Sequence, residues 1–209
     1  MSATESATLR LAALLLDYPS RELFAATAEL RGAAERVPAS AGGRELRAFL
    51  ERRAAQDELV AQEEYVATFD FHKRASLYLS YHRDGDRRQR GATLLGLKRR
   101  YREAGLELSG GELPDYLPAV LEFAALAPEE GGSVLRRLRP GIELLRAALR
   151  DLGSPYGEVL DAVVRTLPAA SDADLDRVRR VAIEGPPAEQ VGLEPFAPPE
   201  AMPPAGALR

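Results

Sequence analysis

The stretch YVATFDFHKRASLYLSYH, from Tyr65 to His82, leads into GDRRQRG at positions 85–91. Two further phrases follow, AGLEL at 104–108 and ELPDYLPAVLEF at 112–123. Apolar side chains recur in these phrases at intervals of three and four, which is the period of an amphipathic helix. None of the phrases shows the strict apolar–polar alternation of a half-buried strand. The block therefore predicts helices that are joined by short turns.

Composition favours the same fold class outside this block. The chain has 209 residues, a length typical of one domain with its own core. Leu and Ala dominate its apolar residues, and both are strong helix formers. Seven of the 15 prolines lie between positions 186 and 204, where Glu is the main charged residue. We expect an all-α, single-domain multi-helix bundle over residues 1–183 and a flexible Pro/Glu-rich tail over 184–209.

Capping signals divide the first part of the chain into helices. We expect helices over 4–16, from Ser20 to about position 37, and over 44–69 with an interruption near Ala55. Another is expected over 86–104, with Gly105 as its C-terminal cap. The inward-facing positions of the 44–69 segment are predicted to be Leu46, Phe49, Leu50, Leu59, Tyr65, Val66 and Phe69.

The second part begins with the phrase LPDYLP at 113–118. With Asp115 as N-cap, Pro118 falls in the first turn, where its missing N–H is tolerated. We then expect a helix from Ser133, kinked at Pro140 and resumed over 142–152. Ser154 is predicted to cap a helix to about position 167, and a last helix is expected over 172–183.

Several classes of function are disfavoured by composition. The absence of cysteine excludes disulfides, thiolate nucleophiles and thiolate-bound metal. The N-terminus lacks a secretory signal, and its apolar run, 11–16, is too short to span a bilayer, so we expect a cytoplasmic protein without membrane insertion. A net charge of −4 argues against nucleic acid as the partner.

Charge is unevenly distributed along the middle of the chain. Residues 73–102 contain ten Lys or Arg, whereas residues 103–130 contain seven Asp or Glu and no base. These runs are either two solvated helical faces or a dipolar surface that brings a charged peptide into register.

Residues for catalysis or metal binding are hard to find. The sequence has no Gly-rich phosphate loop, nucleophile elbow or zinc-protease motif. His72 and His82 are ten residues apart, which is not the spacing of a two-histidine metal site. Asp115 is interpreted as a helix cap rather than an acid or base. We therefore expect no enzyme, no metal and no cofactor.

The quoted phrases resemble the NarJ family, chaperones that mature the molybdenum subunit of respiratory nitrate reductase. The resemblance runs through Phe69-Asp70, Lys73-Arg74, His82, the Gly85–Gly91 set and Leu113–Phe123. The family's usual histidine within the last phrase is Tyr116 here, and its usual serine after Gly85-Asp86 is Arg87.

Membership in this family would imply an all-helical fold of the TorD/NarJ type and no catalysis. It would also imply binding of the N-terminal peptide of the apo catalytic subunit, in support of molybdenum cofactor insertion and against premature membrane assembly. Two alternatives remain open. The chain would serve another molybdoenzyme, such as a dimethyl sulfoxide, trimethylamine oxide or (per)chlorate reductase, or it would be an unrelated helical adaptor. The oligomeric state is also open.

A client peptide is expected to dock as a helix on a groove near positions 78–82 and 115–122. Aromatic side chains would supply contact area, and charged ones would set the orientation. The candidate residues are Tyr78, Tyr81, His82, Arg87, Arg88, Arg90, Asp115, Tyr116 and Glu122.

Overall fold

The first two helices begin at serine capping residues. The computed structural model describes residues 1–84, 88–108, 111–170, 176 and 178. The Ser2 hydroxyl accepts a hydrogen bond from the Glu5 N–H at 3.2 Å, and the Glu5 carboxylate accepts one from the Ser2 N–H at 2.7 Å. This capping box begins the first helix, and the Ser20 hydroxyl caps the second as expected.

The regular secondary structure of the described residues is helical. Its α-helices are α1 (Ala3–Leu16), α2 (Arg21–Ala25), α3 (Thr27–Glu35), α4 (Gly43–Ala54), α5 (Glu58–Phe69), α6 (Leu79–Asp84), α7 (Arg88–Glu103), α8 (Leu117–Leu126), α9 (Pro128–Asp151) and α10 (Tyr156–Arg165). Two 3-10 turns, η1 (Ala39–Ala41) and η2 (Lys73–Ala75), connect them. Within these residues β-pairing is limited to one isolated bridge, so the expected all-α fold is confirmed. The predicted 184–209 tail lies outside the described residues.

The end of α7 confirms the predicted cap at Gly105. This glycine has φ +75°, a left-handed conformation that side chains with a Cβ rarely adopt. Its N–H donates to the Arg102 carbonyl at 2.9 Å, and the Leu106 N–H donates to the Tyr101 carbonyl at 2.9 Å. These two bonds form a Schellman motif, which turns the chain back under α7.

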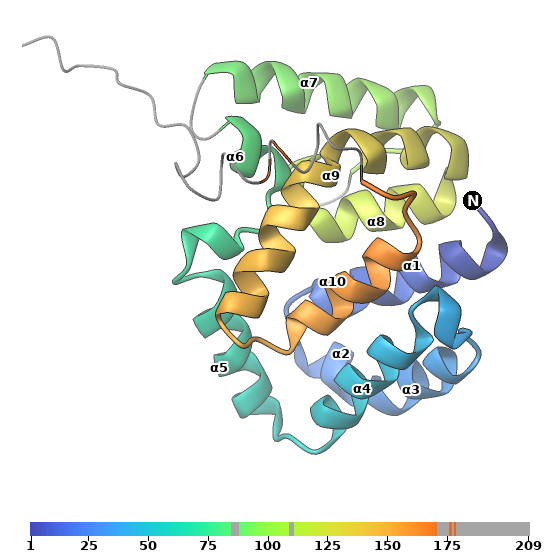
Figure 1. Ribbon diagram of the computed structural model, residues 1–209, viewed down its shortest axis with the longest axis vertical. Coiled ribbons are helices and arrows are strands. Elements are labelled where there is room, and N and C mark those ends of the chain that lie inside the picture. Colours follow the sequence, from blue (N-terminus) through green and yellow to red (C-terminus); the bar gives the residue numbers. More distant parts are fainter. Residues whose placement is uncertain (85–87, 109–110, 171–175, 177, 179–209) are drawn as a thin grey trace, which may run out of the picture.

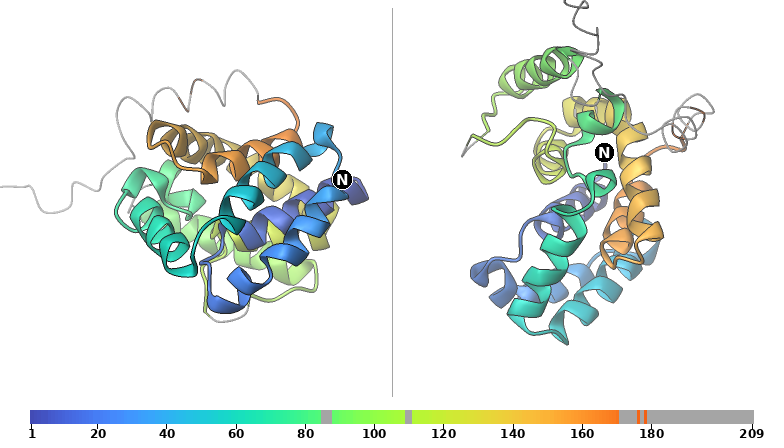
Figure 2. Two further views of the ribbon diagram at one scale, coloured as in Figure 1. Left: turned by 90° about the horizontal axis from the view of Figure 1, so that it is seen from below. Right: turned by 90° about the vertical axis from the view of Figure 1, so that its left-hand side faces the viewer.

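The bundle is built around α1, which packs on α8 and α10 (Figure 1). α9 lies against α8 and α6, and α4 packs on α10 and α3. By contrast, α7 lies at the edge of the bundle in Figure 1 and in the right-hand view of Figure 2. Residues 106–108, which follow α7, line a common hollow with α1 and α8.

The core contains a cluster of four aromatic rings from α4, α5 and α10. The rings of Phe49, Tyr65, Phe69 and Tyr156 have centroids 4.7 to 5.8 Å apart. The buried Arg53 guanidinium lies over this cluster and donates to the Tyr156 hydroxyl at 2.8 Å. The predicted burial of Phe49, Tyr65 and Phe69 is confirmed.

Two of the predicted inward positions are wrong. Leu59 is 65% exposed, and Val66 is only half-buried. The inward face of α5 is set by Ala61, Tyr65 and Thr68, and a residue two positions before Ala61 points about 200° away around the helix. Leu59 therefore faces outward although it is apolar.

Some helix boundaries also differ from the expectations. The helix from Ser20 breaks at Ala26 into α2 and α3. α9 begins at Pro128 rather than at Ser133, because proline is preorganised for a first helical position. The next turn packs closely on α8 at Gly131. A Cβ on Gly131 would lie only 2.2 Å from the Ala124 Cα atom. The helix expected over 172–183 lies outside the described residues except at positions 176 and 178.

Pro140 lies inside α9, which remains one helix over its 24 residues. Proline removes one backbone hydrogen bond from the helix interior and favours a bend. Figure 1 shows α9 changing direction part of the way along, in agreement with the predicted kink. The neighbouring Gly141 lies so close to α6 that an added Cβ would be 2.8 Å from the Leu79 carbonyl oxygen.

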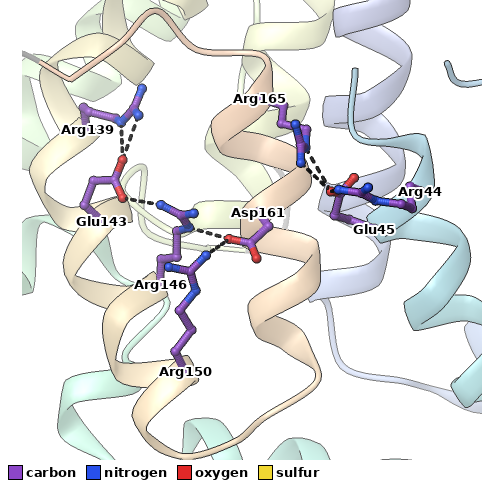
Figure 3. A network of polar contacts seen from close by, with 8 residues as sticks. All are labelled: Arg44, Glu45, Arg139, Glu143, Arg146, Arg150, Asp161 and Arg165. Atoms are coloured by element: carbon purple, nitrogen blue, oxygen red, sulfur yellow. Dashed lines mark hydrogen bonds and ion pairs between the residues drawn. The ribbon is translucent and has the colours of Figure 1, made fainter. Parts of the chain in front are cut away.

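The start of α10 differs in detail from the prediction. The helix begins at Tyr156 after Pro155, and the Ser154 side chain caps nothing. Its hydroxyl lies 3.3 Å from the Thr68 hydroxyl instead, so it links the start of α10 to α5. Ion pairs then connect the outer parts of α9 and α10, as Figure 3 shows.

Candidate functional site

Two segments far apart in sequence meet in an isolated antiparallel bridge. Backbone hydrogen bonds of 3.0 and 2.9 Å join residues 77–79 to residues 115–117 and pair Tyr78 with Tyr116. The paired residues are at the position between the two bonds, where side chains of opposite strands come closest. Their ring centroids are 5.4 Å apart. The bridge therefore places both predicted tyrosines side by side.

The predicted role of Asp115 as N-cap of the following helix is wrong. α8 starts at Leu117 without a side-chain cap, and Pro118 is its second residue. Because the bridge draws Asp115 toward α6, its Oδ2 atom accepts hydrogen bonds from Ser80, from the N–H at 3.1 Å and the hydroxyl at 2.5 Å. The Asp115 side chain is completely buried, so it caps α6 and offers no contact to a partner.

Arg90 attaches α7 to this junction. Its Nε–H donates to the Ser80 hydroxyl at 3.2 Å, and its Nη2 atom lies 3.7 Å from Asp115 Oδ2. Its guanidinium carbon is 5.9 Å from the centroid of the Tyr78 ring. With 21% of its side chain exposed, Arg90 is mainly a structural cation, although its outer edge reaches solvent.

His82 is also buried. Its Nε2–H donates to the Ser76 carbonyl at 2.8 Å, because a carbonyl only accepts. Burial lowers the pKa of His82, against smaller opposing effects of the Ser76 carbonyl and of Asp115. The neighbouring Tyr81 is half-buried, with its ring edge against the imidazole. The His82 side chain is therefore part of the packing rather than of an accessible surface.

The remaining predicted site residues, Arg87, Arg88 and Glu122, are not part of this junction as the structure describes it. Arg87 lies outside the described residues, as does the side chain of Arg88. Glu122 is exposed on α8, at some distance along that helix from Tyr116. The structure thus brings together Tyr78, Arg90, Asp115 and Tyr116, and only part of this set faces solvent.

A groove of about 700 Å³ opens beside this junction. Its walls are α1, α8 and the segment after α7, and Figure 1 shows α1 and α8 side by side. Leu14 and Leu126 are 45% and 48% exposed, so the hollow presents apolar surface to solvent. The apolar lining residues are Ala13, Leu14, Leu106, Leu108, Pro118, Ala119, Phe123 and Leu126.

The charged groups of the groove are mostly acidic. Four carboxylates line it against one guanidinium, so its formal charge is −3 at neutral pH. These residues are Asp17, Glu107, Glu112, Glu122 and Arg10. A cationic ligand with an apolar side would match both the lining and the charge.

Tyr116 connects the junction to the groove. Its hydroxyl donates to Asp17 Oδ1 at 3.2 Å and lies 3.4 Å from the Tyr65 hydroxyl. The Tyr78 hydroxyl donates to Glu112 Oε1 at 3.1 Å. Burial raises the pKa of Tyr116, so its phenol stays protonated and keeps donating at neutral pH. Two tyrosines thereby fix two carboxylates of the groove.

Sequence reasoning missed the wall that α1 contributes. The signal was present, because the apolar run at 11–16 covers more than one face of a helix and must leave part of itself outside the core. Leu14 is the member that stays exposed.

No other site chemistry is evident in the described residues. They hold no group of three histidine, aspartate or glutamate side chains arranged for a metal ion. Among their helices, none combines the length and the apolar character needed to cross a lipid bilayer.

The fold matches that of a solved structure described as a putative redox enzyme maturation protein from Archaeoglobus fulgidus. The TM-score is 0.58 at 21% identity, over 76% of this chain and 90% of the other. The molecule thus has the all-helical architecture of that protein, with a groove on its α1–α8 face. Residues 35–161 match the family described as nitrate reductase delta subunit, and the chain belongs to this family. The resemblance seen in the sequence is confirmed.

The names of similar proteins agree with this assignment. The chain is 35% identical to the probable nitrate reductase molybdenum cofactor assembly chaperone NarJ of Bacillus subtilis, over 73% of this chain and 84% of the relative. It is 33% identical to the Escherichia coli NarJ, over 77% and 69%. It is also 40% identical to the nitrate reductase-like protein NarX of Mycobacterium tuberculosis, of which it spans only 23%.

Proposed function

We propose that this protein is an assembly chaperone of respiratory nitrate reductase that acts in the cytoplasm. It binds the N-terminal region of the apo catalytic subunit, supports molybdenum cofactor insertion and prevents premature membrane assembly. Family membership and the names of the NarJ relatives support the client enzyme. The observation that carries peptide binding is the exposed, acidic and apolar groove between α1 and α8.

The groove suits an amphipathic helix. Helices are commonly recognised by laying an apolar face into a hydrophobic groove, with anchors one turn apart. Leu14 and Leu126 supply exposed apolar surface, and the carboxylates of the rim supply partners for Lys and Arg on the flanks of a client helix. Asp17 and Glu112 are already fixed by tyrosine hydroxyls, which lowers the entropic cost of binding.

Calorimetric titration with a synthetic peptide of the catalytic subunit's N-terminal segment tests this function. Leu14→Ser combined with Leu126→Ser removes apolar contact without adding charge. We expect it to weaken binding about tenfold or more, since each lost leucine contact is worth roughly 1 kcal/mol. Leu59→Ser is the matched control, because Leu59 is more exposed than either leucine but lies on α5, outside the groove. Equal affinities for the double variant and the control would contradict the groove assignment.

A cellular measurement tests the client. Deletion of the gene should abolish respiratory nitrate reduction, and the wild-type chain and the Leu59→Ser variant should restore it. The Leu14→Ser/Leu126→Ser variant should restore it poorly while accumulating to the same level. Undiminished nitrate reduction in the deletion strain would exclude nitrate reductase as the client.

A further inference from the structure

The two ends of the groove differ in charge. Asp17 at the end of α1 meets Tyr116 at the start of α8, so the two helices run antiparallel along the groove. Arg10 lies seven residues before Asp17 on α1, which places it about 10 Å further along the helix axis. The groove therefore runs from the carboxylate of Asp17 toward the guanidinium of Arg10.

One end is acidic. Asp17 and Glu112 are placed there, each accepting a hydrogen bond from a tyrosine hydroxyl. The Asp17 and Glu112 carboxylates also accept the N–H groups of Tyr18 and Leu113, so these hydrogen-bond partners of both are neutral donors, and both carboxylates line the groove.

The other end contains most of the cations. Arg10 lines the groove there, across from the part of α8 that carries Glu122. A second hollow of about 430 Å³ shares four lining residues with the groove and adds Lys98 and Arg102 from α7. The linings at this end therefore include three cations, Arg10, Lys98 and Arg102, with two carboxylates, Glu107 and Glu122, whereas the Asp17 end has two carboxylates and no cation in the lining of the groove.

We propose that the groove sets the direction of the client helix. Its N-terminus lies beside Asp17 and Glu112, and its C-terminal end points toward Arg10 and the basic hollow. This inference rests on the proposed function. An α-helix has a partial positive charge at its N-terminus and a partial negative charge at its C-terminus, and a free α-amino group adds to the first. The opposite direction would place each end beside charges of its own sign.

The direction can be measured by paramagnetic broadening. The chain has no cysteine, so a single introduced cysteine carries a nitroxide at one known place. Leu113→Cys marks the acidic end, and Glu129→Cys marks the end near Leu126; both positions are exposed. With an isotope-labelled client peptide, we expect the label at 113 to broaden N-terminal amides and the label at 129 to broaden C-terminal amides.

Charge removal tests the cause of the direction. Acetylating the peptide's α-amino group should weaken binding roughly two- to fivefold, as expected for one charge at a helix end. In an Asp17→Asn/Glu112→Gln variant this penalty should disappear. Glu63→Gln, on the exposed side of α5, is the matched control and should keep it.

The possible results separate the proposed helix direction from the proposed function. A reversed broadening pattern, or equal broadening of both peptide ends by both labels, would overturn the direction and leave the proposed function standing. An acetylation penalty that persists in the Asp17→Asn/Glu112→Gln variant would do the same. Binding without broadening by either label, or absence of binding, would overturn both proposals.

Discussion

The Oδ2 atom of Asp115 accepts a hydrogen bond from the Ser80 hydroxyl at 2.5 Å, although the two residues are 35 positions apart in sequence. The same oxygen accepts the Ser80 N–H and faces the guanidinium of Arg90. One buried carboxylate therefore connects the start of α6, the approach to α8 and the N-terminal part of α7. It thereby holds the start of α8, which forms one wall of the groove.

Removing this carboxylate should destabilise the fold. Asp115→Ala leaves the Ser80 N–H and hydroxyl and the Arg90 guanidinium without their acceptor, and hydrogen bonds to a charged group are worth about 1.5–3 kcal/mol each in mutational series. We expect the free energy of unfolding to fall by about 3 kcal/mol in urea titration.

Ser80→Ala is the matched control for this prediction. It removes a hydroxyl that donates to Asp115 and accepts the Arg90 Nε–H, but it keeps the carboxylate, its hydrogen bond from the Ser80 N–H and its ion pair with Arg90, so its cost should be about 1–2 kcal/mol. If both variants lose the same small amount, Asp115 does not hold the three elements together.

The stability of the protein should depend on the protonation of His82. Burial lowers the pKa of this side chain in the folded state below its ordinary value near 6.5. Below about pH 6.5 the unfolded chain binds a proton at this histidine while the folded chain does not. The contribution of neutral His82 to the free energy of unfolding is therefore fully present above about pH 6.5 and decreases as the pH falls below that value. The slope approaches about 1.4 kcal/mol per pH unit while only the unfolded state is protonated.

The chain provides its own control for this titration. His72 is exposed, so His72→Gln should leave the loss of stability between pH 6.5 and 5 unchanged. His82→Gln should flatten it, because an amide can donate to the Ser76 carbonyl without titrating. Urea titrations at several pH values measure both slopes, and a His82→Gln slope equal to that of the wild type would contradict the assignment.

Local signals in the sequence were sufficient for most helices. The caps at Ser20 and Gly105 and the interruption near Ala55 depend on residues close in sequence, and all three are confirmed. The predicted cap at Asp115 followed the same logic and is wrong. A long-range backbone bridge decides the direction of that carboxylate, and no pattern of neighbouring residues reveals such a bridge.

The candidate site was predictable only in part. Tyr78 and Tyr116 were grouped correctly, since both flank polar residues within the signature phrases. The groove wall from α1 was not predicted, because antiparallel packing of α1 on α8 brings together residues about one hundred positions apart, such as Asp17 and Tyr116. His82 has the polar character of a surface residue, yet tertiary packing buries it.

Glu143 should contribute more to stability than an ordinary helix-surface charge. It accepts hydrogen bonds from Arg139 and Arg146, as Figure 3 shows, and the Arg139 and Glu143 side chains are only 8% and 12% exposed. Among the described residues, Glu143→Ala leaves the buried Arg139 with the Pro168 carbonyl as its partner. Removing one partner of a buried pair is strongly unfavourable, and we expect a loss of about 3 kcal/mol in urea titration.

An exposed ion pair serves as comparison. Asp151 pairs with Arg74 at 3.5 Å, but these side chains are 67% and 62% exposed. Solvent screens such pairs, so Asp151→Ala should change stability by less than about 1 kcal/mol. If Glu143→Ala lowers the free energy of unfolding no more than Asp151→Ala does, the network in Figure 3 contributes no more to stability than an exposed ion pair.

Two glycines of α9 should respond to alanine in opposite directions. A Cβ on Gly141 would lie 2.8 Å from the Leu79 carbonyl oxygen, which is backbone and cannot rotate away, so α6 and α9 must separate. Overpacking of this kind costs about 1–3 kcal/mol, more than the gain of up to about 1 kcal/mol that alanine brings to a helix. A Cβ on Gly132 would meet nothing closer than 3.7 Å, so Gly132→Ala keeps the propensity gain and should stabilise the protein. Thermal and urea unfolding of both variants measure the difference, and a stabilised Gly141→Ala protein would mean that α6 does not need to approach α9 so closely.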